Sequence, residues 1–180
     1  MSLILPTYRI LGKYVLVLLQ SLKLMSKAVH WKEKQGLRPN YFPKRMPNAL
    51  AILALYQFSK LEKFNKHRKE IAKIYFENLE GFDFLRISQR ADPVFLRFPI
   101  RHKDAHKIIK KLWKKNILVG DWYTSAIAPD DTVPEKIGYF RSCFHAEELS
   151  KTTLNLPTHI NISPKQAQEI IHRLTHLLDD

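Results

Sequence analysis

A long helical segment, residues 47–79, limits the folds open to this chain. Pro47 suits a first helical turn, where its missing N–H has no partner, and Gly81 supplies a stop. The second half carries lysines and glutamates on one face, but the first half, ALAILALYQF, is apolar on nearly every side. We therefore expect a neighbouring domain or a second subunit to cover it. The apolar positions recur at steps of three, four or seven: Leu50, Ala54, Phe58, Leu61, Phe64, Ile71, Tyr75 and Leu79.

Short strand patterns follow this helix and predict an α/β fold. Three or four strands would form a mixed or antiparallel sheet that helices cover on one side. In the second strand Arg97 lies on one face. By alternation, the other face carries Val94, Leu96, Phe98 and Ile100. The strands are predicted over residues 83–87, 94–100, 117–119 and 152–156.

Two helices are predicted among and after these strands. The last one begins at Ser163 as N-cap, with Pro164 at the first helical position and Gln166 completing a capping box. Residues 120–141 form a loop long enough to suggest a functional segment, and residues 145–149 form a short turn. The earlier helix, residues 104–115, has as its buried stripe Ala105, Ile108, Ile109, Leu112 and Trp113. The inner stripe of the last helix is Ala167, Ile170, Ile171, Leu174, Leu177 and Leu178.

The first 43 residues read as a separate region. Residues 7–34 predict a basic amphipathic helix, and the stretch LRPNYFPKR after Gly36 is a proline-containing connector. The apolar run YVLVLL is too short to span a membrane and lacks the features of a signal peptide. The helix either packs on the protein or lies in a membrane interface. We expect two regions, 1–43 and 44–180.

The net charge and the cysteine content limit the binding partners and the cellular compartment that we expect for this chain. The formal net charge is +13, and the basic residues are spread over several helices, so they read either as solvated faces or as a site for a polyanion. A single cysteine, Cys143, excludes an internal disulfide framework and favours a cytoplasmic location. We expect Cys143 to be a small buried thiol, not a nucleophile served by His145.

Several familiar motifs are missing. The five glycines lie far apart, so neither a dinucleotide fingerprint nor a P-loop can be written. The pairs His102/His106 and His172/His176 have helical i, i+4 spacing, but no Glu follows the first His as in zinc proteases. We therefore expect no metal site, and interpret these imidazoles as solvated, partly cationic groups.

The segment RMPNALAILALYQFSKLEKFNKHRKEIAKIYFENLEGF resembles the opening of the C-terminal region of DegT/DnrJ/EryC1/StrS aminotransferases. The matching features are Arg45 with Met46, the alanine-rich helix, Arg68, Ile71 with Ala72, and Tyr75. VFLRFPI and NILVGDWY are similar to the family's Phe-Pro strand and a later Gly-containing strand. FHAEELSKTTLNLPTHINISPKQAQEII is similar to its closing stretch. The resemblance covers residues 44 to the end.

This resemblance implies the C-terminal small domain of a fold-type-I aminotransferase dependent on pyridoxal phosphate. Family enzymes transfer an amino group to a nucleotide-linked keto sugar, for amino-sugar and envelope polysaccharide synthesis. Their cofactor lysine lies in an N-terminal domain, and no lysine here matches its motif. We therefore expect no catalytic residue in this chain and no activity or cofactor binding alone. The implied partners are that domain, or a separate chain supplying it, and a second copy in a homodimer.

The resemblance also indicates binding residues. Where the family has an Asn that reaches the cofactor phosphate of the neighbouring subunit, this chain has Pro43, which puts that contact in doubt. Arg45 could hold a phosphate or substrate anion, or form a structural salt bridge. Trp122 and Tyr123 lie in the loop that approaches the sugar substrate, or pack under that loop.

Two other function classes stay open from the sequence. A non-catalytic interaction module would use the apolar half of the long helix as its contact surface. A nucleic-acid-binding domain is suggested by charge alone, because no helix-turn-helix, stacking motif or zinc knuckle is present.

Overall fold

The computed structural model describes residues 12–22, 29–84, 87–88 and 90–179. They belong to two compact units. The first comprises Met1–Lys44 with Pro129–Phe140, and the second comprises Arg45–Ala128 with Arg141–Asp180. The predicted loop 120–141 is therefore divided between the two units.

The first unit is held together by contacts between distant segments. It contains helix α1 (Lys13–Ser21) and the 3₁₀ helices η2 (Glu33–Gln35) and η3 (Pro134–Ile137). The N–H of Val133 donates to the carbonyl of Lys34 at 3.1 Å, and the Lys34 side chain forms an ion pair with Asp131. Gly36 has a φ of 70°, and a Cβ there would lie 2.5 Å from the Lys136 carbonyl oxygen. Only glycine fits this approach.

The predicted continuous helix over residues 7–34 is wrong in its described part. The α-helical part is α1, and residues 33–35 form a 3₁₀ turn that ends at Gly36. Positions 7–11 and 23–28 lie outside the described residues. No helix in the described part of the chain is long and apolar enough to cross a membrane.

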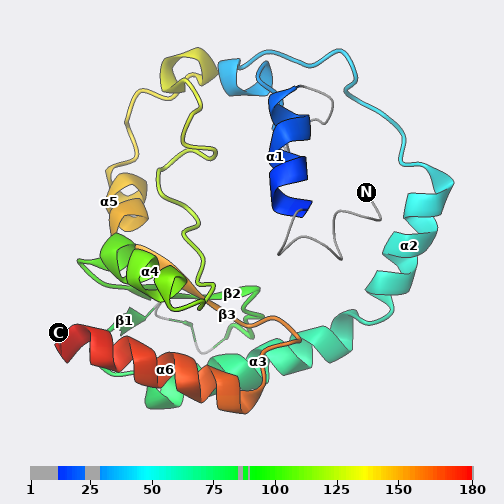
Figure 1. Cartoon of the computed structure of the whole chain (residues 1–180). Coiled ribbons are helices and arrows are strands. Elements are labelled where there is room, and N and C mark those ends of the chain that lie inside the picture. Colours follow the sequence, from blue (N-terminus) through cyan, green and yellow to red (C-terminus); the bar gives the residue numbers. More distant parts are fainter. Residues whose placement is uncertain (1–11, 23–28, 85–86, 89, 180) are drawn as a thin grey trace. The chain divides into compact units, whose positions relative to one another are not determined.

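The second unit is built on a three-stranded antiparallel sheet, as one of the predicted alternatives required (Figure 1). The strands are β1 (Asp83–Phe84), β2 (Arg97–Arg101) and β3 (Thr153–Pro157), in the order β1-β2-β3. Phe98 pairs with Leu156, and Ile100 pairs with Leu154. All four of these side chains are buried, so they mark the core face of the sheet.

Helices complete the core. They are α3 (Leu61–Asn78), α4 (Ala105–Lys114), α5 (Phe144–Thr152) and α6 (Pro164–Asp179). Helices α3 and α6 pack side by side (Figure 1). The hydroxyl of Tyr75 on α3 donates to the carbonyl of Pro157 at 2.9 Å, and burial of this phenol raises its pKa well above the ordinary value. The core thus joins α3 directly to the end of β3.

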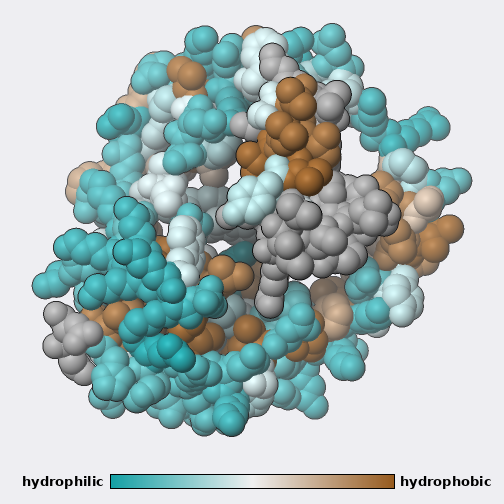
Figure 2. Space-filling view, in the orientation of Figure 1, coloured by the Kyte–Doolittle hydropathy of each residue, from teal (hydrophilic) through white to brown (hydrophobic). Residues whose placement is uncertain are grey.

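The long helix predicted over residues 47–79 is two helices. α2 (Asn48–Phe58) is separated from α3, which begins at Leu61, by Ser59 and Lys60. Ser59 lies at the break, where its hydroxyl donates to the Tyr56 carbonyl at 2.8 Å. Such a side-chain bond competes with the helical backbone pattern, and the sequence periodicity does not reveal it. None of the side chains of α2 is buried, as the brown surface over α2 in Figure 2 illustrates.

The second strand begins later than predicted. Leu96, expected on the core face, is 66% exposed, and Val94 is also exposed. The carbonyls of Phe95 and Leu96 lie 2.7 and 3.0 Å from the Thr158 hydroxyl, which donates to them. Because these carbonyls bond to a side chain, strand pairing starts only at Arg97.

Other local predictions also need correction. Residues 117–119 are not a strand, and Gly120 forms only an isolated bridge to Asn155. The predicted turn at 145–149 is part of α5, because the N–H of Glu147 donates to the Cys143 carbonyl at 3.1 Å. Trp113 is partly exposed, since its indole N–H bonds the Val119 carbonyl at 2.8 Å.

The start of the last helix is as predicted. The N–H of Gln166 donates to the Ser163 hydroxyl at 3.2 Å, and the N–H of Ser163 donates to the Gln166 side-chain oxygen at 2.9 Å. This is the reciprocal pattern of a capping box. The inward stripe from Ala167 to Leu177 is buried, and Leu178 packs against it.

Candidate functional site

The predicted aromatic residues Trp122 and Tyr123 are fixed to the sheet by Asn155. The backbone N–H of Gly120 donates to the Asn155 carbonyl at 2.7 Å, and the N–H of Asn155 donates back to Gly120 at 3.0 Å. The Asn155 side-chain amide, which is buried, donates to the Trp122 carbonyl at 2.5 Å. Since Leu154 and Leu156 point into the core, Asn155 lies on the opposite face of the sheet. The aromatic segment is therefore held against the outer face.

Arg97 lies beside these aromatic rings. Its guanidinium carbon is 4.3 Å from the centroid of the Trp122 ring, a cation–π distance. The Trp122 and Tyr123 rings are stacked, with centroids 6.0 Å apart and planes 9° apart. At Gly120 a Cβ would lie 2.8 Å from the Arg97 guanidinium nitrogen Nη1, so the missing side chain makes room for Arg97. We name Arg97, Trp122 and Tyr123 the arginine–aromatic platform.

The platform can bind a flat or ring-shaped ligand. Trp122 and Tyr123 are 53% and 58% exposed, so much of their ring surface faces outward. In the described part of the chain no carboxylate pairs with Arg97. A guanidinium without a protein counterion can donate two parallel hydrogen bonds to a carboxylate or phosphate. The combination suits a ligand that has both a ring and an anionic group.

Sequence reasoning missed two members of this arrangement. The sequence correctly predicts that Arg97 lies on the face of its strand away from the core. It does not predict which residues Arg97 contacts on that face. Its meeting with Trp122 depends on the pairing of β2 with β3 and on the bridge between Gly120 and Asn155. Asn155 gives no signal in sequence beyond being a polar residue between two leucines.

Arg45 lies apart from these contacts. It is an exposed residue just before α2, and no hydrogen bond or ion pair joins its side chain to another described residue. No contact joins it to Trp122 or Tyr123 among the described residues. Pro43 is exposed in the first unit. The structural salt bridge considered for Arg45 is therefore not seen in the described part of the chain, and its guanidinium is open to an anion.

The described residues do not make a complete site for pyridoxal phosphate. The cofactor needs a lysine in a shielded position and an acidic partner for the ring nitrogen. None of the lysines whose burial is described is buried, and Lys34, one of the partly buried ones, is in an ion pair with Asp131. Nor does the described part contain a group of three or more side chains able to hold a metal.

Two pairs of ionisable side chains on the surface have shifted pKa values. Asp104 and Lys107 are 2.7 Å apart at the start of α4, and their hydrogen bond lowers the pKa of Asp104 and raises that of Lys107. The hydrogen bond from Lys151 to Glu148 likewise raises the pKa of Lys151. Both pairs lie within one turn and read as helix stabilisation. Cys143 is exposed, so the expectation of a buried thiol is wrong: it precedes α5 outside the core.

Solved structures of aminotransferases have a similar fold. DesV from S. venezuelae, in complex with a ketimine intermediate, aligns with a TM-score of 0.65 at 20% identity over 81% of this chain and 42% of that one. TlmJ from Streptoalloteichus hindustanus aligns with a TM-score of 0.59 at 21% identity over 69% of this chain and 34% of that one. A DegT DnrJ EryC1 StrS aminotransferase from Brucella abortus aligns with a TM-score of 0.58 at 19% identity, over 68% of this chain and 33% of that one.

The family of this chain follows from the residues that a family model matches, and its extent follows from the share of the solved relatives that it spans. It spans about a third to two-fifths of the length of these solved relatives. No curated protein matches it. The model of the DegT/DnrJ/EryC1/StrS aminotransferase family matches residues 19–175, which begins well before residue 44, where the resemblance in the sequence begins. The chain belongs to the DegT/DnrJ/EryC1/StrS aminotransferase family.

Proposed function

We propose that this chain is the C-terminal part of a pyridoxal-phosphate-dependent aminotransferase that acts on nucleotide-linked keto sugars. The family match over residues 19–175 carries this proposal. The reaction would supply amino sugars for envelope polysaccharides. The domain that contributes binding groups would be residues 44–180, with residues 1–43, which contain α1 and η2, as an N-terminal extension and connector.

The platform supports a substrate of this kind. Trp122 and Tyr123 present ring faces on which a sugar or base can pack. Arg97 supplies a fixed positive charge beside them for a phosphate oxygen of the nucleotide part. Arg45, exposed and without a partner among described residues, is the group we assign to the cofactor phosphate or a substrate anion.

The cofactor itself would be held by sequence outside these 180 residues. That sequence would be an N-terminal domain, in the same polypeptide or on a separate chain, and it would supply the lysine. When bound, pyridoxal phosphate supplies the electron sink for amino transfer. Exposed apolar side chains on α2 support a contact surface for such a domain or for a second copy in a homodimer.

The test follows the absorbance of the lysine–cofactor imine on adding pyridoxal phosphate to the purified chain. The chain alone should give no imine band. The chain mixed with, or fused to, the N-terminal domain of a family enzyme should give the band and transaminate a nucleotide-linked keto sugar. An imine band with the chain alone would mean that one of its own lysines acts, and would refute the inactive-alone proposal.

A non-catalytic interaction module is the second candidate, because all described side chains of α2 lie outside the core. It would bind the N-terminal domain without restoring transamination. The two candidates therefore differ in the activity measured in the same mixture.

The proposed location is the cytoplasm, with the segment that contains α1 either packed on the protein or attached to the membrane surface. In the described part of this segment, Tyr14, Val15, Val17 and Leu18 are exposed apolar side chains (Figure 2). Flotation of a lysate tests the attachment. Recovery of all the protein in the aqueous fraction, at both low and high salt, would contradict it.

A further inference from the structure

Two histidine pairs have the same spacing in sequence, but the structure gives them different surroundings. In the first pair, the His102 ring nitrogen Nδ1 accepts the N–H of Asp104 at 3.0 Å. The His106 ring nitrogen Nε2 is 3.2 Å from the Ser150 carbonyl. His102 also precedes α4, so the two rings do not share a helix face. In the first pair, a ring nitrogen of each histidine therefore already contacts a backbone group of the protein.

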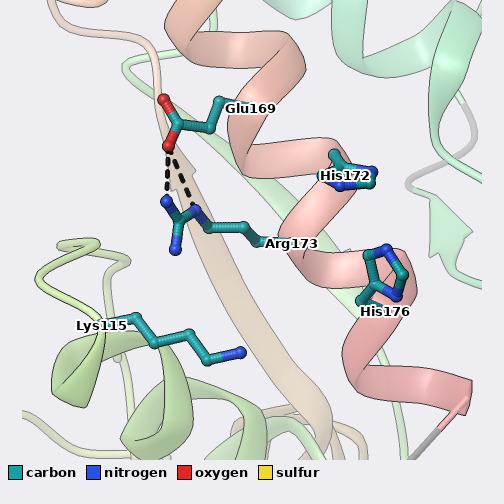
Figure 3. A pocket seen from close by; sticks show the side chains of 5 residues that line it. All are labelled: Lys115, Glu169, His172, Arg173 and His176. Atoms are coloured by element: carbon teal, nitrogen blue, oxygen red, sulfur yellow. Dashed lines mark hydrogen bonds and ion pairs between the residues drawn. The ribbon is translucent and has the colours of Figure 1, made fainter.

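The second pair is available. His172 and His176 both lie inside α6, one turn apart, and both are exposed. Their ring centroids are 4.5 Å apart, at an interplanar angle of 83°. Neither ring forms a hydrogen bond with another described residue. Figure 3 shows the two rings projecting from successive turns of the helix. Residues four apart on a helix are neighbours on one face, which keeps the rings together.

We propose that His172 and His176 form a two-ligand site for a divalent transition-metal ion, Cu²⁺ most tightly. Neutral imidazole nitrogens bind such ions at about 2.0–2.1 Å. Two nitrogens on one ion then lie roughly 3 Å apart, which exposed rings with centroids 4.5 Å apart reach by rotation. Water would fill the remaining coordination positions. Copper is favoured because a given nitrogen site binds it more tightly than Ni²⁺ or Zn²⁺.

The neighbouring charges set the strength of this site. The surrounding pocket is lined by Lys115, which follows the end of α4, and by Glu169 and Arg173 from α6 (Figure 3). Glu169 accepts hydrogen bonds from Arg173 at 2.7 and 3.2 Å, both at Oε1, and this ion pair competes with metal coordination by the carboxylate. Lys115 and Arg173 add positive charge beside the ion. The site is therefore a two-ligand site that a positive neighbour weakens.

Calorimetric titration of the full chain with Cu²⁺, Ni²⁺ and Zn²⁺, in a buffer that does not bind metals, tests the proposal. His172→Gln and His176→Gln should each weaken Cu²⁺ binding by at least about 10-fold, the effect known for lost outer contacts of metal sites. The matched control, His106→Gln, should bind as the unchanged chain does. Electron paramagnetic resonance of the copper complex should show two coordinated nitrogens.

One further measurement makes the proposal specific. Lys115→Ala should strengthen Cu²⁺ binding, because it removes a positive charge from the pocket. Equal binding by the unchanged chain and the His172→Gln/His176→Gln double variant would overturn the proposal. Equal loss in His106→Gln would do the same.

Discussion

At the scale of single residues, the proposed binding of substrate rests on the contact between Arg97 and Trp122. The guanidinium stacks on the indole at 4.3 Å, and Gly120 leaves the space for it. A lysine in this place would keep the charge but lose the planar group that stacks and forms paired hydrogen bonds. A lysine at position 97 therefore tests the contribution of the planar guanidinium separately from that of the positive charge.

We expect Arg97→Lys to weaken binding of the keto-sugar substrate in the assembled enzyme. Arg97 can donate two hydrogen bonds to a substrate phosphate where a lysine donates one, and loss of a hydrogen bond to a charged group costs about 1.5–3 kcal/mol, which corresponds to a rise in KM of roughly 10- to 150-fold. The rate constant kcat should change little, because the platform binds substrate and takes no part in the chemistry. Steady-state kinetics on reconstituted enzyme give both values. The matched control is Arg101→Lys, an exposed arginine on the same strand; an equal effect there would contradict the role given to Arg97.

The sequence indicated part of this site and missed the rest for a physical reason. Trp122 and Tyr123 were predicted because a resemblance places that loop near substrate. Arg97 and Asn155 were not, since their contacts arise from strand pairing between residues more than fifty positions apart. Cys143 was predicted to be buried on the average behaviour of free thiols, but its place before a surface helix decides its exposure.

At the scale of elements, local hydrogen bonds decide where helices begin and end. Helix α6 starts where the sequence predicts because Ser163 and Gln166 satisfy each other's backbone N–H groups. Helix α2 ends at Phe58, and directly after it the Ser59 hydroxyl bonds the carbonyl of Tyr56. The capping box of Ser163 and Gln166 can be recognised in the sequence by the three-residue spacing of these two residues. The Ser59 hydrogen bond depends on a side-chain rotamer that periodicity does not describe.

We expect Ser163→Ala to destabilise the chain by about 0.5–2 kcal/mol, the usual cost of removing an N-cap side chain. Gln166→Ala should also destabilise it, because the N–H of Ser163 loses its acceptor. Gln168→Ala, at an exposed position on the same helix, is the control and should change stability little. Urea unfolding followed by circular dichroism measures all three. If Gln168→Ala costs as much as Ser163→Ala, the cap is not the source of the effect.

At the scale of the whole molecule, the distribution of apolar surface shows how far this chain can serve as a complete unit. The second unit buries a continuous core from α3, α4, α6 and the sheet. Yet α2 leaves six large apolar side chains between 54% and 71% exposed: Leu50, Ile52, Leu53, Leu55, Tyr56 and Phe58. A monomer in water does not tolerate this surface well. We therefore expect another domain or a second copy of the chain to cover α2.

This surface gives a prediction for the isolated chain. We expect it to self-associate as concentration rises, because α2 offers an apolar helix with no cover within the described residues. Ile52→Gln with Leu55→Gln should shift it toward the monomer in sedimentation velocity experiments. Glutamine is a good helix former, so circular dichroism should show unchanged helix content.

The matched control for α2 is Leu118→Gln, at a leucine that is 78% exposed outside that helix. If exposed apolar area alone drove association, this change would reduce it as well. If the α2 surface drives it, Leu118→Gln should sediment as the unchanged chain does. The α2 double variant should in addition lose binding to the cofactor domain, since both contacts would use the same side chains. Retained binding by that variant would assign α2 to self-association only, and would place the cofactor domain on another face of the chain.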